Sequence, residues 1–302
     1  PTTSPRTASV SAKGAAEKRL GNTRYGLGAT ATFQAWFADS TVKLTPGTPC
    51  PTGVRDTIRI STAANESQSF QLVLSPKTDF EFRDIRVSAL ACGDHRLAAT
   101  NVEFHQVEYV KVTKRARINQ VSFFDSIGDP LVAVTSRKVK AGSGNVAFWV
   151  TLRTPAKTTA GIYTGTLSVV GGQGATMEFP LAVTVHDFEL PEFSSFRSNM
   201  GGQYLAKKGS DPGVNPVMAY RGLKSKGELK KLALKYYEAM AREKFYPKNV
   251  ALFTEIGLKW KPPPRGYNVA APGNFFELTE WDFTKFNRLM EHFIDRLKVN
   301  SV

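Results

Sequence analysis

The sequence has 302 residues, of which 41% are hydrophobic and 22% are charged, a composition typical of globular proteins and long enough for two domains. Its 40 lysines and arginines outnumber its 26 aspartates and glutamates, which gives a net charge of +14 at pH 7. The basic residues are spread along the chain and form no nucleic-acid-binding motif, so we expect no nucleic-acid partner and interpret the charge as a solvated basic face or an affinity for acidic polymers.

The N-terminal residues 1–28 are expected to be a flexible tail. Most of this segment is rich in Ser, Thr, Ala, Pro and Lys and has no apolar period. The chain does not begin with Met, so we expect a processed form or an expressed piece from which any signal peptide is already gone. It also has no run of about 18 apolar residues, so we expect no membrane span.

Residues 29–191 are expected to form an all-β sandwich domain. Short segments rich in β-branched and aromatic residues recur between clusters of Pro, Gly, Asn and Asp. They include 57–61, 68–74, 84–90, 107–113 and 146–152. Many short strands with such turns are typical of a sandwich, although a closed barrel would give the same pattern.

The closing stretch 148–191 carries the clearest strand pattern. Residues 162–169 and 179–186 both alternate with a period of two, which a helix does not do. Between them, 171–174 reads as a hairpin turn and not as a phosphate-binding loop. We therefore expect this stretch to close the sandwich at Pro191, with a new domain after it.

The two cysteines, Cys50 and Cys92, both lie in the β-rich half near turn residues. They could form one disulfide in an oxidising compartment or remain two thiols, and the sequence leaves both readings open.

After Pro191 the pattern changes to α/β. A capping box formed by Ser225 and Glu228 predicts one helix, and residues 279–282 are expected to open a second. Apolar runs at 250–253 and 299–302 predict strands, which gives a βα order. A (β/α)₈ barrel takes roughly 250 residues and only about 110 follow Pro191, so residues 192–302 are either a small α/β unit or an incomplete barrel.

Several motifs occur in order along the sandwich. An aromatic strand with Asp-Ser covers 34–40, an N-E followed by F-Q-L-V covers 65–74, D-P-L covers 129–131, a W-V element followed by G-x-Y-x-G covers 149–165, and D-F-E-L-P covers 187–191. Ala64 stands where Arg is usual in this pattern, and Gly128 replaces a Pro. In this order the chain resembles glycoside hydrolase family 123 proteins, which implies a β-sandwich followed by the first βα units of a (β/α)₈ catalytic barrel, an incomplete TIM barrel.

Most of these motif residues have a structural interpretation. Gly161 and Gly165 suit a turn and a close backbone approach, and Trp149 supplies buried area. Asn65 and Glu66 could be a catalytic carboxamide and acid, but their place between two strands favours a loop-fixing role. The motif D-P-L at 129–131 is expected to be a turn.

The resemblance implies a retaining β-N-acetylgalactosaminidase-like activity in which the 2-acetamido group of the substrate is the nucleophile. An adjacent Asp-Glu pair assists such enzymes: the Asp orients the acetamido group, and the Glu acts as acid and base. Residues 192–302 contain no such pair. We therefore expect the pair to lie beyond this chain, the catalytic residues to be unknown here, and the chain alone to be inactive.

What this chain could contribute is part of a pocket rim, because barrel active sites lie at the C-terminal ends of the strands. The candidate substrate-binding residues are Asn199, Tyr204, Thr254, Glu255 and Trp260, with Trp260 expected in a loop. Trp and Tyr suit stacking on a sugar, and amides suit its hydroxyls. The alternative reading is that Tyr204 and Trp260 cover a core edge.

We expect no metal and no cofactor. The histidines are scattered without metal-ligand spacing, and no nucleotide-binding or Ser-His-Asp signature is present.

The sequence thus predicts a glycoside hydrolase-like protein, secreted or at the cell surface or in the periplasm, acting on N-acetylhexosamine-containing glycans or glycoconjugates. The alternative is a non-catalytic carbohydrate-binding or surface-interaction protein that favours acidic polysaccharides. A third reading is that a second polypeptide completes the barrel.

Overall fold

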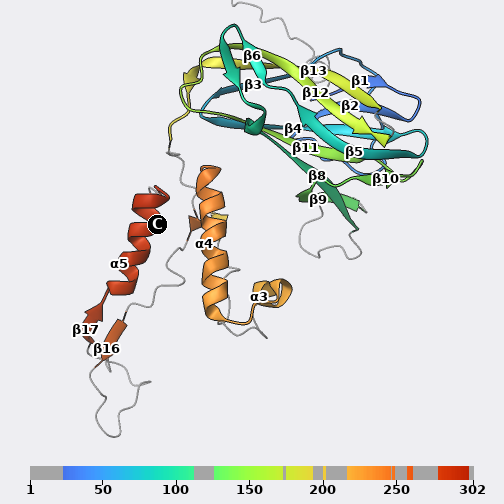
Figure 1. The fold of residues 1–302 in the computed structure, drawn as a ribbon. Coiled ribbons are helices and arrows are strands. Elements are labelled where there is room, and N and C mark those ends of the chain that lie inside the picture. Colours follow the sequence, from blue (N-terminus) through green and yellow to red (C-terminus); the bar gives the residue numbers. More distant parts are fainter. Residues whose placement is uncertain are drawn as a thin grey trace, which may run out of the picture. The chain divides into compact units, whose positions relative to one another are not determined.

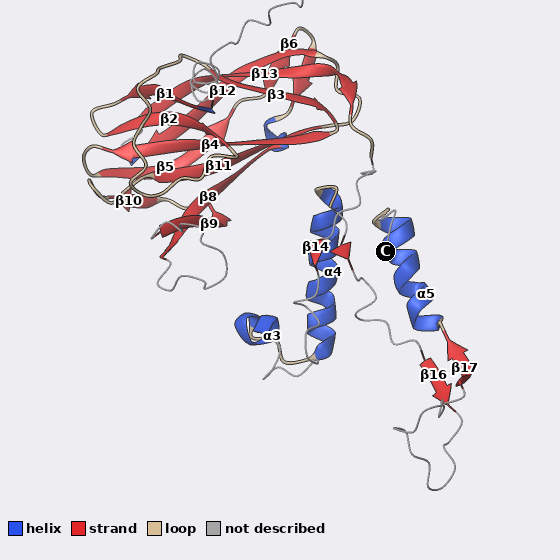
Figure 2. Ribbon diagram, turned by 180° about the vertical axis from the view of Figure 1, so that it is seen from behind, coloured by secondary structure: helices blue, strands red, loops and turns tan. Residues whose placement is uncertain are grey.

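The computed structural model describes residues 23–111, 126–172, 175–192, 200–201, 216–245, 247–248, 257–260 and 278–298. The chain divides into two compact units, Pro1–Leu190 and Pro191–Val302. Strands dominate the first unit, and the described α-helices all belong to the second (Figures 1 and 2).

Within the described residues, the first unit contains two β-sheets that face each other across a core (Figure 1). The first sheet is antiparallel and has the spatial order β1 (Arg24–Ala29), β2 (Phe33–Asp39), β4 (Glu66–Pro76), β11 (Val146–Thr154), β8 (Val102–Lys111), β9 (Ser126–Ala133).

The second sheet has the order β10 (Arg137–Val139), β5 (Phe80–Val87), β12 (Gly161–Gly171), β13 (Thr176–Glu189), β3 (Ile58–Ala64). Two short strands, β6 (Leu90–Cys92) and β7 (His95–Leu97), attach beside β12, and a 3₁₀ turn η1 (Ala99–Asn101) precedes β8. The β3–β13 pair is parallel. These two facing sheets agree with the expected sandwich.

Side-chain alternation builds the core between the sheets. Phe37, Leu72 and Phe148 face inward from the first sheet and meet Phe82 and Leu167 from the second. The rings of Phe82 and Phe148 lie 4.7 Å apart between centroids. Each side chain of this size contributes about 1.5–3 kcal/mol when fully buried.

A second cluster covers the opposite face of the first sheet. This outer-face cluster contains Trp36, Ala38, Leu44, Val73, Val107 and Ala147, with Val42, Cys50 and Trp149 packed against it. The indole Nε1 of Trp36 donates to Ser75 Oγ at 2.9 Å, and Ser75 Oγ donates to Asn145 Oδ1 at 2.6 Å. Asn145 Nδ2 in turn donates to the Thr48 carbonyl at 2.7 Å. This series of hydrogen bonds therefore holds the β2–β3 connection over the sheet.

The two cysteines lie in different places. Cys50 packs in the outer-face cluster, whereas Cys92 packs against the core between the sheets. Both are free thiols, so the disulfide alternative is not realised.

Two sequence predictions in this unit are wrong. The tail was expected to extend to residue 28, but β1 begins at Arg24, and Tyr25 is buried and stacked on Phe37. The 129–131 segment was expected to be a turn, but Asp129 and Pro130 lie inside β9, where the register shifts opposite β8. A proline fits there because β9 is an edge strand and the irregular position needs no N–H.

In the second unit, β14 (Met200–Gly201) pairs in parallel with β15 (Pro247–Lys248), and helices α3 (Pro216–Arg221) and α4 (Lys226–Arg242) lie between them in the chain. The predicted capping box at the start of α4 is confirmed, with Ser225 as N-cap and Glu228 at the third helical position. Helix α5 (Thr284–Glu291) continues into a π-helical turn, η4 (His292–Arg296).

A separate small core holds these helices together. Ala233 and Tyr237 of α4 pack with Met290 of α5 and Phe293 of η4, all buried. The Tyr237 and Phe293 rings meet edge to face at 5.2 Å.

The start of the last helix was predicted incorrectly. Residues 279–282 lie in strand β17 (Leu278–Asp282), which pairs antiparallel with β16 (Gly257–Trp260), and α5 begins at Thr284. Asp282 Oδ1 still accepts from the Thr284 backbone N–H at 2.9 Å, so the acid stabilises the helix start from outside it.

The strands predicted at 250–253 and 299–302 lie outside the described residues. The parallel β14–β15 pair fits one βα unit, and the barrel itself stays a prediction. None of the described helices combines the length and apolar character needed to cross a bilayer.

Candidate functional site

Of the predicted substrate-binding residues, Asn199, Tyr204, Thr254 and Glu255 lie outside the described residues. Trp260 lies in strand β16, opposite Leu278 of β17, and not in a loop as expected. Trp260 therefore belongs to the antiparallel pair of strands β16 and β17. The prediction that these residues form a pocket rim stays a prediction.

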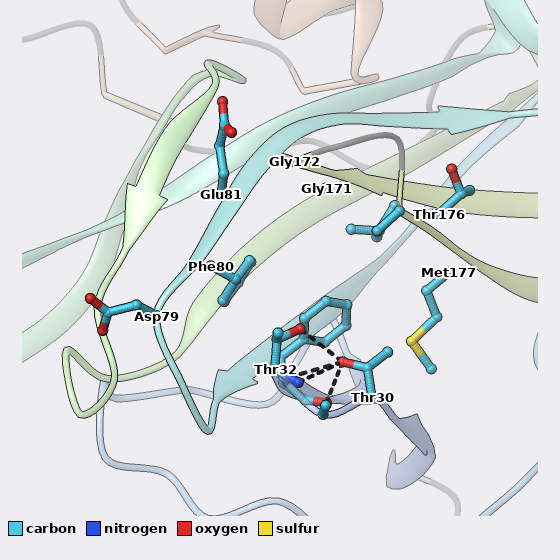
Figure 3. A pocket seen from close by; sticks show the side chains of 13 residues that line it. Thr30, Thr32, Asp79, Phe80, Glu81, Gly171, Gly172, Thr176 and Met177 are labelled. Carbon is cyan, nitrogen blue, oxygen red and sulfur yellow. Dashed lines mark hydrogen bonds between the residues drawn. The ribbon is translucent and has the colours of Figure 1, made fainter.

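The first unit contains a pocket of about 510 Å³, here called the sandwich-end pocket (Figure 3). Three connections line it, together with the strand residues next to them: β1–β2 with Thr30, Thr32 and Phe33; β4–β5 with Asp79, Phe80 and Glu81; and β12–β13 with Gly171, Gly172, Thr176 and Met177. Phe33 and Phe80 form a tilted pair with centroids 5.1 Å apart. The pocket therefore combines an apolar floor with hydroxyl and carboxylate groups.

Thr30 fixes the geometry of the β1–β2 turn. Its Oγ1 accepts from the backbone N–H groups of Thr32 and Phe33, both at 3.1 Å (Figure 3). The Thr32 carbonyl in turn accepts from the backbone N–H of Lys77 at 2.8 Å. These bonds join the two turns, so this part of the rim is preorganised.

The β12–β13 hairpin approaches β5 closely at Gly172. A Cβ at this position would lie 2.7 Å from Glu81 Oε2 and 3.0 Å from Glu81 Cβ. Gly171 N donates to the Ala175 carbonyl at 2.6 Å, in keeping with the predicted hairpin turn. The glycine allows the third connection to close one side of the pocket.

Both carboxylates of the sandwich-end pocket are paired with cations. Lys140 Nζ lies 2.7 Å from Asp79 Oδ2, and Arg83 Nε lies 3.2 Å from Glu81 Oε1. The hydrogen bond from Lys140, followed by one from the Ala141 backbone N–H, lowers the pKa of Asp79 below its usual value. A carboxyl group whose pKa is lowered in this way is a poor general acid, so Asp79 is not suited to donate a proton in catalysis.

The family-like motifs converge on a second pocket of about 210 Å³, on the outer face of the first sheet. Ser40, Gln71, Asp129 and Trp149 come from four different motifs, and all line it. Gln71 Nε2 donates to the Val42 carbonyl at 2.8 Å and so shapes the rim. Sequence reasoning assigned these residues structural roles and missed that they meet; the adjacency of β2, β4, β11, β8 and β9 brings them together.

Asn65 and Glu66 have the loop-fixing role that we favoured. Glu66 Oε2 accepts from the Ala63 backbone N–H at 2.6 Å, and Asn65 Nδ2 donates to the Leu190 carbonyl at 2.9 Å. Asn65 itself has a φ of 59°, where the chain passes from β3 in one sheet to β4 in the other. Both side chains therefore fix the backbone at the corner between the two sheets.

No group of three or more His, Cys, Asp or Glu side chains that could hold a metal occurs within the described part of the chain.

Comparison with known proteins gives one family match, to part of the chain. Residues 49–171 match the model of the glycoside hydrolase 123 N-terminal domain. No curated protein matches the chain.

The fold also resembles solved structures. One is a family 123 glycoside hydrolase from Clostridium perfringens, studied for glycolipid glycan hydrolysis, with a TM-score of 0.61 and 10% identity over 87% of this chain. The match covers 46% of that protein, so the chain spans less than half of it.

Weaker matches are a PapD-like domain of human CEP192 (TM-score 0.23, 14% identity, 44% of this chain and 84% of that one) and a FixG-related protein from Vibrio parahaemolyticus (TM-score 0.23, 12% identity, 40% and 80%). Residues 49–171 thus match the glycoside hydrolase 123 N-terminal domain, and the chain shares its fold with the Clostridium perfringens enzyme of family 123.

Proposed function

We propose that this chain serves the hydrolysis of N-acetylhexosamine-containing glycans by a retaining, substrate-assisted mechanism. The observation that carries the proposal is the match of residues 49–171 to the glycoside hydrolase 123 N-terminal domain. The fold likeness over 87% of the chain supports it. We also propose a secreted, cell-surface or periplasmic location, where the protein would encounter such glycans.

The chemistry in this proposal needs two carboxyl groups around the acetamido nucleophile. No adjacent Asp-Glu pair occurs in residues 192–302. In the sandwich, Asp79 and Glu81 are already ion-paired. We therefore assign the sandwich a binding role, with its end pocket contacting glycan, and assign the acid and base to sequence other than these 302 residues.

Hydrolysis of p-nitrophenyl N-acetyl-β-D-galactosaminide by this chain and by the full gene product would test the proposal. We expect no turnover by the chain alone, and turnover by the full product with retention of anomeric configuration in NMR spectra. The matched substrate p-nitrophenyl β-D-galactoside lacks the acetamido nucleophile, so its kcat/KM should be lower by about 100-fold or more. Inversion, or equal rates on both substrates, would rule out the mechanism.

A second candidate is a non-catalytic protein that binds acidic glycans, favoured by the net charge of +14. Its test is binding of the chain to heparin at increasing ionic strength, with neutral dextran as control. This function predicts an affinity that falls steeply with salt. Binding that does not change with salt, or equal binding to dextran, would contradict it.

A further inference from the structure

Helices α4 and α5 enclose a pocket of about 340 Å³ between them, here called the helix-pair pocket. On α4, Lys230, Leu234 and Tyr237 follow one another at spacings of four and three residues and so share one face. Arg288 of α5 and His292 at the start of η4 have the same four-residue spacing. Two helix faces therefore point into one space.

The charge of this pocket has a single sign. Lys230, Lys285 and Arg288 line it, together with His292, and no acidic side chain is among its lining residues. Leu234 and Leu289 supply the apolar wall. Cations gathered around a partly apolar space attract an anion, because the low-dielectric wall strengthens the attraction.

Two polar atoms at the pocket lack partners among the described residues. The Tyr237 hydroxyl and His292 Nε2 are both buried, and neither accepts or donates a hydrogen bond among the described residues. The side chain of Tyr237 is only 1% exposed. Buried polar atoms are normally hydrogen-bonded, so an orphaned pair beside a cavity indicates a ligand that supplies the missing partner.

We propose that the helix-pair pocket binds a small organic anion, specifically a sugar unit that carries a sulfate or carboxylate group. The anionic group lies among Lys230, Arg288 and the Tyr237 hydroxyl, and the apolar face of the ring packs on Leu234 and Leu289. This site shares no residue with the sandwich pockets, and the choice of a sugar as the organic part of the anion rests on the hydrolase function proposed above.

The state of Tyr237 agrees with this role. Burial raises the pKa of its hydroxyl above the usual value, so the group stays protonated at neutral pH and can donate to an anion. His292 can present a proton on either ring nitrogen and so can serve as a second donor.

Calorimetric titration of the whole chain tests the proposal with three probes: N-acetylgalactosamine 6-sulfate, uncharged N-acetylgalactosamine, and sodium sulfate. We expect the sulfated sugar to bind at least about tenfold more tightly than either other probe, because only it engages both the cations and the apolar wall. Failure of the sulfated sugar to bind would overturn the proposal. Equal affinity for sodium sulfate would contradict the proposed contact between the sugar ring and the apolar wall.

Matched variants locate the binding. Lys230→Gln and Arg288→Gln should each raise the Kd of the sulfated sugar by about five- to tenfold. The controls Lys231→Gln and Arg296→Gln remove the same charge from exposed positions that do not line the pocket, and should change the Kd by less than about twofold. Equal effects of Lys230→Gln and Lys231→Gln would show diffuse attraction and contradict a defined site.

Tyr237→Phe separates binding from folding. This change removes the orphaned hydroxyl but keeps the ring that packs on Phe293, so the thermal unfolding temperature should hold or rise. The Kd of the sulfated sugar should increase by about fivefold. An unchanged Kd would contradict the role of Tyr237 as a donor to the anion.

Discussion

The side-chain amide of Asn65 donates a hydrogen bond to the backbone carbonyl of Leu190 at 2.9 Å, across 125 residues of sequence. Leu190 returns the contact through its own N–H, which donates to the Ala64 carbonyl at 2.9 Å. The corner where the chain passes between the sheets is thereby joined to the last residue of the first unit. One side chain thus fixes both the corner and the exit from the sandwich.

Substitution of Asn65 should separate the contribution of its side-chain hydrogen bond from the cost of its positive φ. Asn65→Ala loses the hydrogen bond and leaves a residue with Cβ at a φ of 59°, so we expect a loss of about 2–3 kcal/mol in the free energy of unfolding. Asn65→Gly loses the bond but tolerates this φ, and should cost about 1 kcal/mol. Urea denaturation measures both. A glycine variant less stable than the alanine variant would contradict this account.

Gly165 of β12 is expected to be intolerant of any side chain. A Cβ there would lie 2.5 Å from Leu90 Cδ2 and 3.2 Å from the Ala89 carbonyl oxygen, and that oxygen belongs to the backbone and cannot rotate away. Gly165→Ala should destabilise the chain by about 1–3 kcal/mol. Gly53→Ala, which meets nothing within 4 Å, is the control and should change stability by less than about 0.5 kcal/mol. Similar thermal shifts for both variants would rule out the close approach.

The sandwich could be predicted because its inward and outward residues alternate. Tyr163 and Leu167 are buried while Ile162 and Thr164 are exposed, and this period is visible in the sequence. Tyr25 was missed because Gly26 and Gly28 interrupt the apolar pattern of a short strand in which Tyr25 stacks on Phe37.

The candidate sites were less predictable than the strands. The pocket shared by Ser40, Gln71 and Trp149 depends on which strands are neighbours, and a single sequence does not state strand order. The segment ending at Asp282 has residues that suit a helix start, yet its pairing with β16 makes it a strand, because tertiary contacts override local preference.

Lys140 is expected to control the titration of Asp79 at the rim of the sandwich-end pocket. The Lys140 hydrogen bond lowers the pKa of Asp79, so this pair contributes stability above the unfolded pKa of the acid and loses it as the pH falls through the folded pKa. Lys140→Gln should raise the pKa of Asp79 toward 3.8 but not fully, since the Ala141 N–H still donates at 2.9 Å. NMR titration of the Asp79 carboxyl measures this shift.

The control for this titration is Lys138→Gln, an exposed position on the neighbouring strand β10. It should leave the pKa of Asp79 where it is. An equal rise in both variants would show a general charge effect in place of the specific bond.

Asn145 is expected to protect Cys50 from thiol reagents. Its amide holds the Thr48 carbonyl at 2.7 Å, and this bond keeps the adjoining segment, with the half-buried Cys50, on the outer-face cluster. Burial raises the pKa of the Cys50 thiol, which lowers the thiolate fraction at neutral pH. Asn145→Ala should release the segment, lower that pKa toward its usual value, and speed labelling of Cys50 by about threefold or more.

Labelling with iodoacetamide, followed by peptide mass analysis, reads the two cysteines separately. Cys92 packs against the core between the sheets and is the internal control, so its rate in Asn145→Ala should stay within about twofold of the wild-type rate. Ser75→Ala removes the bond to Asn145 Oδ1 but leaves the bond to Thr48, so its effect on Cys50 should be smaller. Equal acceleration at both cysteines would indicate global unfolding, and an unchanged Cys50 rate would show that Asn145 does not hold the segment in place.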